Sequence, residues 1–372
     1  MRVAGIRDKS IPLAAIQLGL PAVPQEGEQP SVLHRALNYP QLRFMGSKFR
    51  LLPWIYIVLR DLPFHAALDA FSGSGCVGYL MKSMGKQATA NDFLRFSFVV
   101  AQATIANSEV RLREDTVQKL VEGPGADKHF IEKTFRGIFF TPADLRFLDR
   151  VWWNIQTLGS AEERAIALAA LIRSCVKRQP RGVFTVAGDP TRYKDGRRDL
   201  RLSLQAHFIE QVGIFNQAVF NNGQRNRALN KDVFELDPTG YDLVYMDPPY
   251  VPRADDNCYV KRYHFLEGLI SYWRDVEILP ETRVRKIRKP YTPFSYRRDA
   301  EEAFDRLFAR FSRSILVLSY SSNGYPDLAI LVRLMRRYKR EVKVHRKPHQ
   351  YFFGTHEKVQ RDRVEEYLIV GR

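Results

Sequence analysis

Residues 66–92 decide the fold of this chain, and they read AALDAFSGSGCVGYLMKSMGKQATAND. The apolar run at 66–70 predicts a buried strand, and the glycines and serines at 72–75 predict a tight turn. Residues 77–83 then predict a helix, and a second strand ends at Asp92. Because a strand, a helix and a strand follow one another, we expect parallel strands with a helix packed against them, which is the opening of an α/β fold.

The glycines of this stretch have the spacing of a nucleotide-binding loop. Gly73, Gly75 and Gly78 match GxGxxG, a pattern that lets backbone amides approach a ligand closely. Asp92 follows at about the distance where a carboxylate binds ribose hydroxyls. Nicotinamide dinucleotides and S-adenosylmethionine both contain such an adenosine, and the glycine loop alone does not choose between them.

A second stretch, YDLVYMDPPY at 241–250, carries the chemistry. Its apolar run predicts a short buried strand that Asp247, Pro248 and Pro249 end abruptly. Prolines donate no hydrogen bond and have a fixed φ, so the turn is rigid. It presents a carboxylate, backbone carbonyls and the Tyr250 ring together, which suits the binding of a flat polar molecule.

The amine of adenine fits this turn. It is a poor nucleophile because its lone pair is delocalised into the ring. If the Asp247 carboxylate and the Pro248 carbonyl each accept one N–H, they favour a pyramidal nitrogen and stabilise the charge that develops during methyl transfer. Tyr250 would stack on the base. None of the three cysteines follows a proline, which argues against the cysteine nucleophile needed to methylate the ring carbon of cytosine.

The composition indicates a basic globular protein. Its 372 residues contain 58 Lys and Arg against 41 Asp and Glu, a formal charge of +17. Such an excess favours a polyanionic partner, most commonly nucleic acid, although a merely basic surface is the alternative. No apolar run approaches the about 20 residues of a membrane span. We therefore expect a soluble cytoplasmic protein with no membrane partner.

The cysteines and histidines do not predict a metal centre or a disulfide framework. The three cysteines lie far apart without CxxC spacing. His345 and His349 lie near His356 and Glu357, but these residues read as a loop and lack an HExxH pattern. We expect no metal.

Periodicity divides the chain into parts. Residues 1–30 read as an N-terminal arm, whereas 31–104 and 226–372 have the α/β pattern of one catalytic domain. Helical periodicity dominates the 105–225 segment between them, which we interpret as an inserted domain.

Two basic tracts are candidates for nucleic-acid contacts. The tract at 177–204 alternates Lys and Arg with turn residues and with Phe184 and Tyr193, which suits a loop that follows phosphates and offers rings to bases. The tract at 283–298 has the same character and predicts another wall of a groove.

With these motifs in order, the sequence resembles the Dam-like (alpha-class) family of S-adenosylmethionine-dependent DNA adenine methyltransferases. The resemblance spans about residues 40–325. Its matching pieces are RFMGSK at 43–48, DAFSGSG at 69–75, ND at 91–92, NKDVF at 230–234, DPPY at 247–250 and LSYSS at 318–322.

The resemblance implies a Rossmann-like methyltransferase fold, mostly parallel, with an inserted, largely helical DNA-recognition domain. It also implies S-adenosylmethionine as the cofactor, its methionine part held by Lys48 and the loop, its ribose by Asp92. The cofactor-binding residues that it implies are Phe44, Lys48, Asp69, Phe71, Gly73, Gly75, Asp92, Asp232 and Phe234, the last two at the adenine. GVFTV at 182–186 has Thr185 where the family has asparagine, so no base contact is carried over.

The implied function is site-specific methylation of adenine N6 in duplex DNA, with the base rotated out into the site. It suggests a bacterial or phage enzyme of a restriction-modification system, or an orphan methylase, with no obligatory protein partner. Alternatives are the amine of cytosine, adenine in RNA, and an inactive DNA-binding protein. Asp247 and Tyr250 argue against the last. A nicotinamide dehydrogenase would leave DPPY and the charge unexplained.

Overall fold

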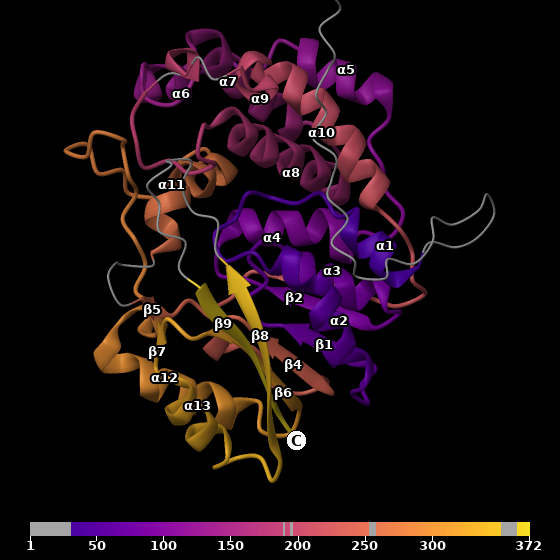
Figure 1. The fold of residues 1–372 in the computed structure, drawn as a ribbon. Coiled ribbons are helices and arrows are strands. Elements are labelled where there is room, and N and C mark those ends of the chain that lie inside the picture. The colour runs from indigo at the N-terminus through magenta and orange to yellow at the C-terminus, as the bar shows by residue number, and fades with distance from the viewer. Residues whose placement is uncertain (1–30, 189, 194–195, 253–257, 351–362) are drawn as a thin grey trace, which may run out of the picture.

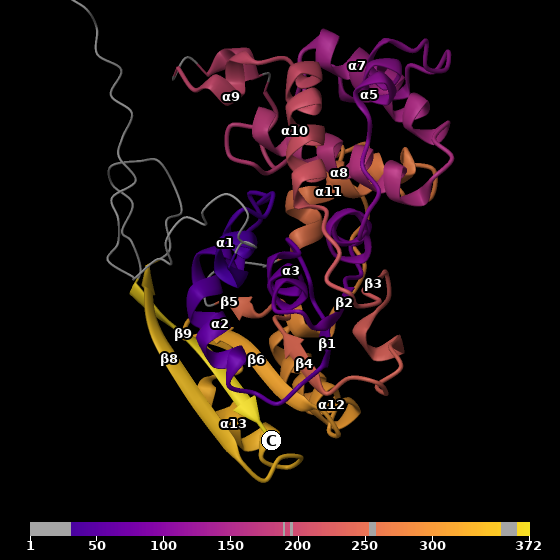
Figure 2. The same cartoon turned by 90° about the vertical axis from the view of Figure 1, so that its right-hand side faces the viewer.

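The computed structural model describes residues 31–188, 190–193, 196–252, 258–350 and 363–372. The predicted N-terminal arm, 1–30, and the candidates His356 and Glu357 lie outside these residues. A twisted sheet with helices on both faces forms one end of the molecule, and a group of helices forms the other (Figures 1 and 2).

The sheet has seven strands in the order β3-β2-β1-β4-β6-β9-β8. The five strands from β3 to β6 run parallel, and β9 and β8 add an antiparallel hairpin at one edge. This arrangement confirms the predicted α/β, Rossmann-like fold. The strands are β1 Ala66–Asp69, β2 Gln87–Asn91, β3 Arg227–Leu229, β4 Leu243–Met246, β6 Ile315–Ser321, β8 Val342–Gln350 and β9 Arg363–Gly371.

Alternate residues of the central strands enter two cores. Along β4, Leu243 and Tyr245 belong to the larger core, and Val244 and Met246 to the smaller one. All four are buried because both faces of a parallel sheet are covered. The larger core is covered by α1 Val32–Leu37, η1 Lys48–Leu51, α2 Leu52–Arg60, α3 Cys76–Ser83, α4 Arg95–Ala101 and η2 Gln102–Ala106; the smaller core by α12 Arg297–Arg310 and α13 Leu328–Met335.

Two long helices in the helical end of the molecule begin at N-capping side chains. Thr141 accepts a hydrogen bond from the Asp144 amide at the start of α7, and Ser160 caps α8 in the same way. After the Asp-Pro-Pro-Tyr turn, α11 Tyr259–Ser271 also packs here, because its Phe265 contacts Phe139 and Phe184. The other helices of this part are α5 Glu114–Glu122, α6 Phe130–Phe135, α7 Pro142–Gln156, α8 Ala161–Arg178, η3 Pro190–Arg192, α9 Arg198–Arg201 and α10 Leu204–Ala218. The inserted domain at 105–225 remains a prediction.

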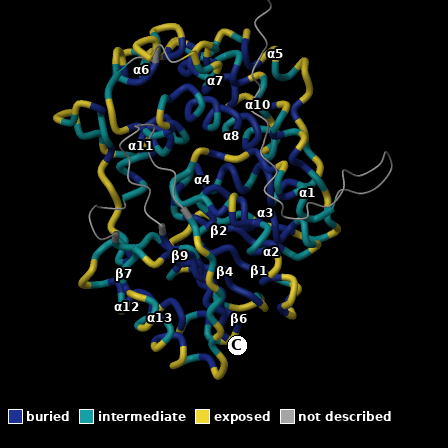
Figure 3. Tube along the Cα trace, viewed as in Figure 1, coloured by how far each residue is buried: buried dark blue, intermediate teal, exposed yellow. Residues whose placement is uncertain are grey.

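Two local expectations were wrong. His345 and His349 lie on strand β8, not in a loop, because β9 pairs with the whole segment. No cluster of metal-binding side chains occurs in the described part of the chain. Phe184 is fully buried and stacks on Phe265 at 5.1 Å, so its ring is not offered to bases. In Figure 3, most of α8 and of the central strands has the dark blue of buried residues.

Candidate active site

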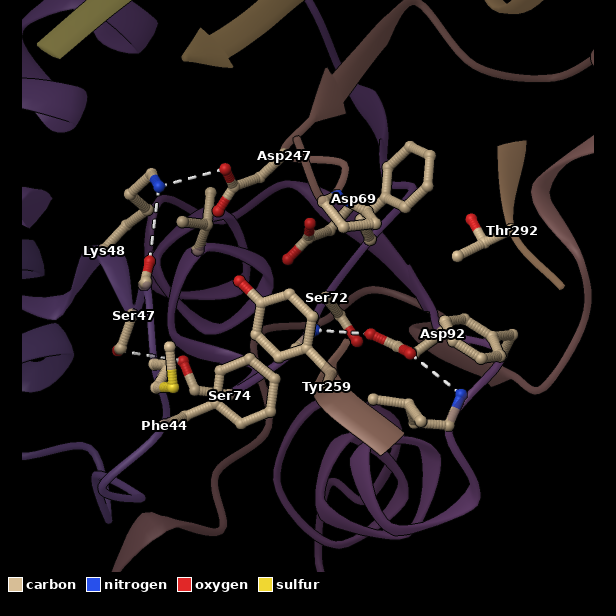
Figure 4. Close-up of a pocket in the computed structure, with 18 of the residues that line it drawn as sticks. Phe44, Ser47, Lys48, Asp69, Ser72, Ser74, Asp92, Asp247, Tyr259 and Thr292 are labelled. Carbon is tan, nitrogen blue, oxygen red and sulfur yellow. Dashed lines mark hydrogen bonds and ion pairs between the residues drawn. The ribbon is translucent and has the colours of Figure 1, made fainter. Parts of the chain in front are cut away.

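The carboxyl ends of β1, β2 and β4 meet at one edge of the sheet and bring three acidic residues together. Asp69 ends β1, Asp92 follows β2 and Asp247 follows β4. Parallel α/β sheets bind ligands at this edge. Here a cavity is lined by all three carboxylates (Figure 4). Its wall also includes the predicted residues Phe44, Lys48, Phe71, Gly73 and Pro249.

Lys48 and Asp247 form an ion pair in the cavity wall. The Lys48 Nζ lies 3.0 Å from Asp247 Oδ1 and also donates to the Gly46 carbonyl at 3.2 Å. Ser47 caps the short helix that begins at Lys48, and this cap fixes the backbone from which the lysine side chain extends. Burial raises the pKa of Asp247 above its ordinary value, although the Lys48 charge opposes that rise. The pair therefore holds a carboxylate in one orientation at the strand end.

The glycine loop is tied to Asp92. The Gly73 amide donates to Asp92 Oδ2 at 2.7 Å, and the Leu94 amide donates to Oδ1 at 2.9 Å. Burial raises the pKa of Asp92 to about 6. Gly73 has φ +50°, and a Cβ there would lie 3.0 Å from the Phe44 ring, so only glycine fits without strain. Each carboxylate oxygen keeps a lone pair for a hydroxyl of a ligand.

Asp69 is the most deeply buried of the three acids. Its Oδ2 accepts the Gly78 amide at 2.8 Å, whereas its buried Oδ1 has no hydrogen-bond partner among the described residues. Burial raises the pKa of Asp69 to about 8. A buried polar atom without a partner is costly, which is typical of a group that meets a ligand.

A stack of three rings forms another wall. Phe44 lies between Tyr259 at 5.2 Å and Tyr263 at 5.1 Å, nearly parallel to both. The Met45 amide donates to the Tyr263 hydroxyl at 2.8 Å, which fixes the stack to the residues just before Lys48. Tyr259 lines the cavity, although no sequence motif predicted it as a site residue. Its spacing of four from Tyr263 on a helix was the available signal.

Several predicted site residues do not line this cavity. Gly75 has φ +82°, and a Cβ there would lie 2.4 Å from the Tyr39 hydroxyl, so it shapes the turn. Tyr250 packs against Tyr320 at 5.2 Å. The turn that contains Pro248 and Tyr250 continues into β5 Val251–Pro252, which pairs with β7 Gly324–Tyr325.

Asp232 and Phe234 lie beyond a further ring. Asp232 accepts the Phe234 amide at 2.9 Å and caps η4 Val233–Glu235. Phe294, on η5 Pro293–Ser295, stacks on Phe234 at 5.8 Å and contacts Phe71 edge-on at 5.4 Å. The Arg306 guanidinium lies 4.4 Å from the Phe234 ring. Phe294 thus lies between the cavity wall and the predicted adenine-binding residues.

Part of the basic tract at 283–298 belongs to the wall of the cavity. Pro290, Thr292 and Ser295 line the cavity. They lie at 283–298, which the sequence predicted only as a wall of a nucleic-acid groove. The neighbouring Tyr291 remains 58% exposed and stacks on Tyr296.

The fold and the acidic strand ends are those of a Rossmann-like methyltransferase. Comparison with known families matches residues 44–315 to the D12 class N6 adenine-specific DNA methyltransferases. The match covers most of the chain, and the chain belongs to this family, as the resemblance predicted. No helix in the described ranges is long and apolar enough to cross a membrane.

Individual relatives agree with the family. The type II methyltransferase M2.HphI of Haemophilus parahaemolyticus is 29% identical over 349 residues, which cover 90% of this chain and 99% of that protein. M.NlaIII of Neisseria lactamica is 21% identical over 80% of this chain and 88% of its own length. M.FokI of Planomicrobium okeanokoites is 26% identical over 76% of this chain, and the match spans only 45% of that longer protein.

Proposed function

We propose that this adenine-specific DNA methyltransferase binds S-adenosylmethionine in the cavity and uses the Asp-Pro-Pro-Tyr turn to methylate N6 of an adenine rotated out of duplex DNA. The observation that carries the proposal is the Lys48–Asp247 pair, because it fixes the carboxylate in the wall that the glycine loop shares.

The donor set of the cavity suits the cofactor. S-adenosylmethionine carries a carboxylate, an ammonium, a ribose and an adenine, and when bound it supplies a methyl group on a positively charged sulfur. Lys48 complements the carboxylate, Asp69 has a free buried oxygen for the ammonium, and Asp92 suits the ribose. The Tyr259 ring in the cavity wall favours positive charge near its face.

The reacting amine would be oriented by the chain alone. The Asp247 carboxylate and the Pro248 carbonyl accept its two N–H groups, which directs the lone pair toward the cavity. The raised pKa of Asp247 also suits it to take the proton that the methylated amine loses. Tyr250 supplies a ring face for the base, and Tyr320 supports that ring.

The phosphates of DNA would be attracted to the positive charge of the protein. The charge of +17 favours a polyanion, and rotation of one base out of the stack is the general solution for chemistry on a base. We infer that the helical segment 105–225 contributes to target recognition. The type II names of the relatives support a role in a restriction-modification system.

The test is to incubate the protein with duplex DNA and methyl-labelled S-adenosylmethionine, and then to digest the DNA to nucleosides. We expect the label in N6-methyldeoxyadenosine. Label in methylcytidine, or label in RNA but not in DNA, would overturn the proposal. Calorimetric titration with S-adenosylmethionine tests cofactor binding separately.

A further inference from the structure

A hairpin at 277–288 projects beside α11 as an orange loop at the edge of Figure 1. Ile278 and Ile287 form an antiparallel bridge, and the Leu279 amide donates to the Lys286 carbonyl at 2.7 Å. At the tip, the Thr282 hydroxyl donates to the Leu279 carbonyl and accepts the Lys286 amide at 2.8 Å. Ile287 and Val284 are buried. The hairpin is therefore internally braced and anchored.

A loop from the helical segment lies against this hairpin. The Phe184 amide donates to the Arg262 carbonyl at 2.8 Å, and the Phe184 carbonyl pairs with His264 Nε2 at 2.8 Å. With its ring buried, Phe184 fixes the loop to α11, while the next two residues, Thr185 and Val186, are exposed. Val186 is 51% exposed, so its side chain is accessible to a ligand in the groove.

The two elements enclose a surface groove with free cationic groups. The exposed Arg283 and half-buried Lys286 side chains form no hydrogen bond or ion pair with the described residues. By contrast, Arg288 pairs with Glu277, and Arg285 donates to the Pro280 carbonyl. The groove is lined by Thr185, Val186, Ala187, Thr282, Arg283, Val284 and Lys286.

The groove is tethered close to the active site. Pro290 lines the cavity, and an extended chain spans at most about 3.6 Å per residue. Lys286 therefore lies within about 14 Å of Pro290, and Arg283 within about 25 Å. Since base pairs are stacked about 3.4 Å apart, these upper limits correspond to at most roughly four and seven base-pair steps from Pro290 in the cavity wall.

We propose that this groove reads DNA sequence beside the target adenine. Arg283 donates to a guanine in the major groove, Thr185 and Val186 contact a neighbouring base edge such as a thymine methyl, and Lys286 binds a phosphate. These side-chain types make those contacts in protein–DNA complexes. The inference rests on the proposed function, and it adds the hairpin at 277–288, which lies outside the 105–225 segment, to the recognition surface.

The experiment maps the methylated sites on plasmid DNA from cells that express each variant, and measures kcat/KM on the site that the wild-type protein methylates. For Arg283→Ala we expect about 10- to 100-fold lower kcat/KM at that site and acceptance of other bases at one position. Arg283→Lys should relax the same position, because lysine lacks the bidentate geometry. Lys286→Ala should weaken DNA binding equally for all sequences and reduce the salt slope by about one.

Arg60→Ala, at the end of α2, is the matched control, because it removes an exposed arginine whose contacts are local, an ion pair with Asp61 and the face of the Tyr56 ring. Affinity for S-adenosylmethionine, measured by calorimetry, should stay unchanged in every variant. An unaltered methylated motif in Arg283→Ala would overturn the inference, and so would an equal loss for all sequences. Failure of the wild-type protein to methylate adenine would instead refute the proposed function.

Discussion

The Lys48 ammonium lies 3.0 Å from the Asp247 carboxylate, and this contact joins the segment before α2 to the end of β4. The lysine side chain is 6% exposed and the aspartate side chain 21% exposed. Charges removed from water to this extent are costly unless they are paired, and the Lys48 charge opposes the rise that burial causes in the pKa of Asp247. Both the reactivity and the pH dependence of the site should therefore depend on this pair.

Replacement of Asp247 tests its role in transfer. Asp247→Ala removes an acceptor of the adenine amine, and we expect the single-turnover rate to fall by at least about 100-fold, the effect of losing one polar group aimed at a transition state. Affinity for S-adenosylmethionine should change only a few fold in calorimetry. Asp247→Asn, which preserves the shape, should be nearly as slow. Loss of cofactor binding in Asp247→Asn would show that Asp247 serves the cofactor instead.

Removal of the lysine charge should shift the pH dependence. Transfer requires ionised Asp247, so activity is lost as the pH falls through the Asp247 pKa, which burial raises above 3.8. Lys48 lowers that pKa, and Lys48→Met should therefore raise it. The acid limb of kcat/KM, measured at saturating cofactor, should move to higher pH. Lys86→Met removes a lysine that binds the Phe64 carbonyl and should leave the limb in place. An unmoved limb in Lys48→Met would contradict the prediction.

The parts of the site that the sequence predicted correctly depend on local signals. The strand, turn and helix at 66–92 follow from an apolar run and glycines that the backbone requires, as the positive φ of Gly73 and Gly75 shows. The two prolines mark the end of β4 because proline has a fixed φ and cannot donate a hydrogen bond to a neighbouring strand. Residues 43–48 were assigned to the cofactor site through their resemblance to a family motif.

The features that escaped prediction depend on tertiary contacts. Strand β8 lies at the edge of the sheet and contains many polar residues, so its sequence alone does not indicate a strand. Pairing with β9 holds it in the sheet. Phe184 lies in a basic tract but enters an aromatic core formed by helices distant in sequence. No periodicity in the sequence indicates that Phe294 stacks on Phe234.

The Phe294–Phe234 stack provides a test of the adenine site. If the cofactor adenine stacks on Phe234, it must displace Phe294, and that displacement opposes binding. Phe294→Ala should therefore tighten S-adenosylmethionine binding a few fold, whereas Phe234→Ala should weaken it by about 10-fold, the effect of one lost aromatic stack. Both affinities are measurable by calorimetry below the unfolding temperature. Weaker binding in Phe294→Ala would assign the cofactor contact to Phe294 itself.

Gly78 tests the packing that supports the glycine loop. A Cβ on Gly78 would lie 2.8 Å from Ile105 Cδ1 and 3.2 Å from Asp69 Oδ2. Since Ile105 is fully buried, Gly78→Ala should lower the free energy of unfolding by about 1–3 kcal/mol. Gly213→Ala, at an exposed position of α10 with open space around it, should instead raise that free energy by up to about 1 kcal/mol.

Denaturant unfolding of both alanine variants measures the difference. Adding Ile105→Val to Gly78→Ala removes the clashing methyl group, so the double variant should be more stable than the sum of the two single changes predicts. Additive losses would show that the strain falls on Asp69. In that case Gly78→Ala should also weaken binding of S-adenosylmethionine, because the Asp69 carboxylate would be displaced from the cavity wall.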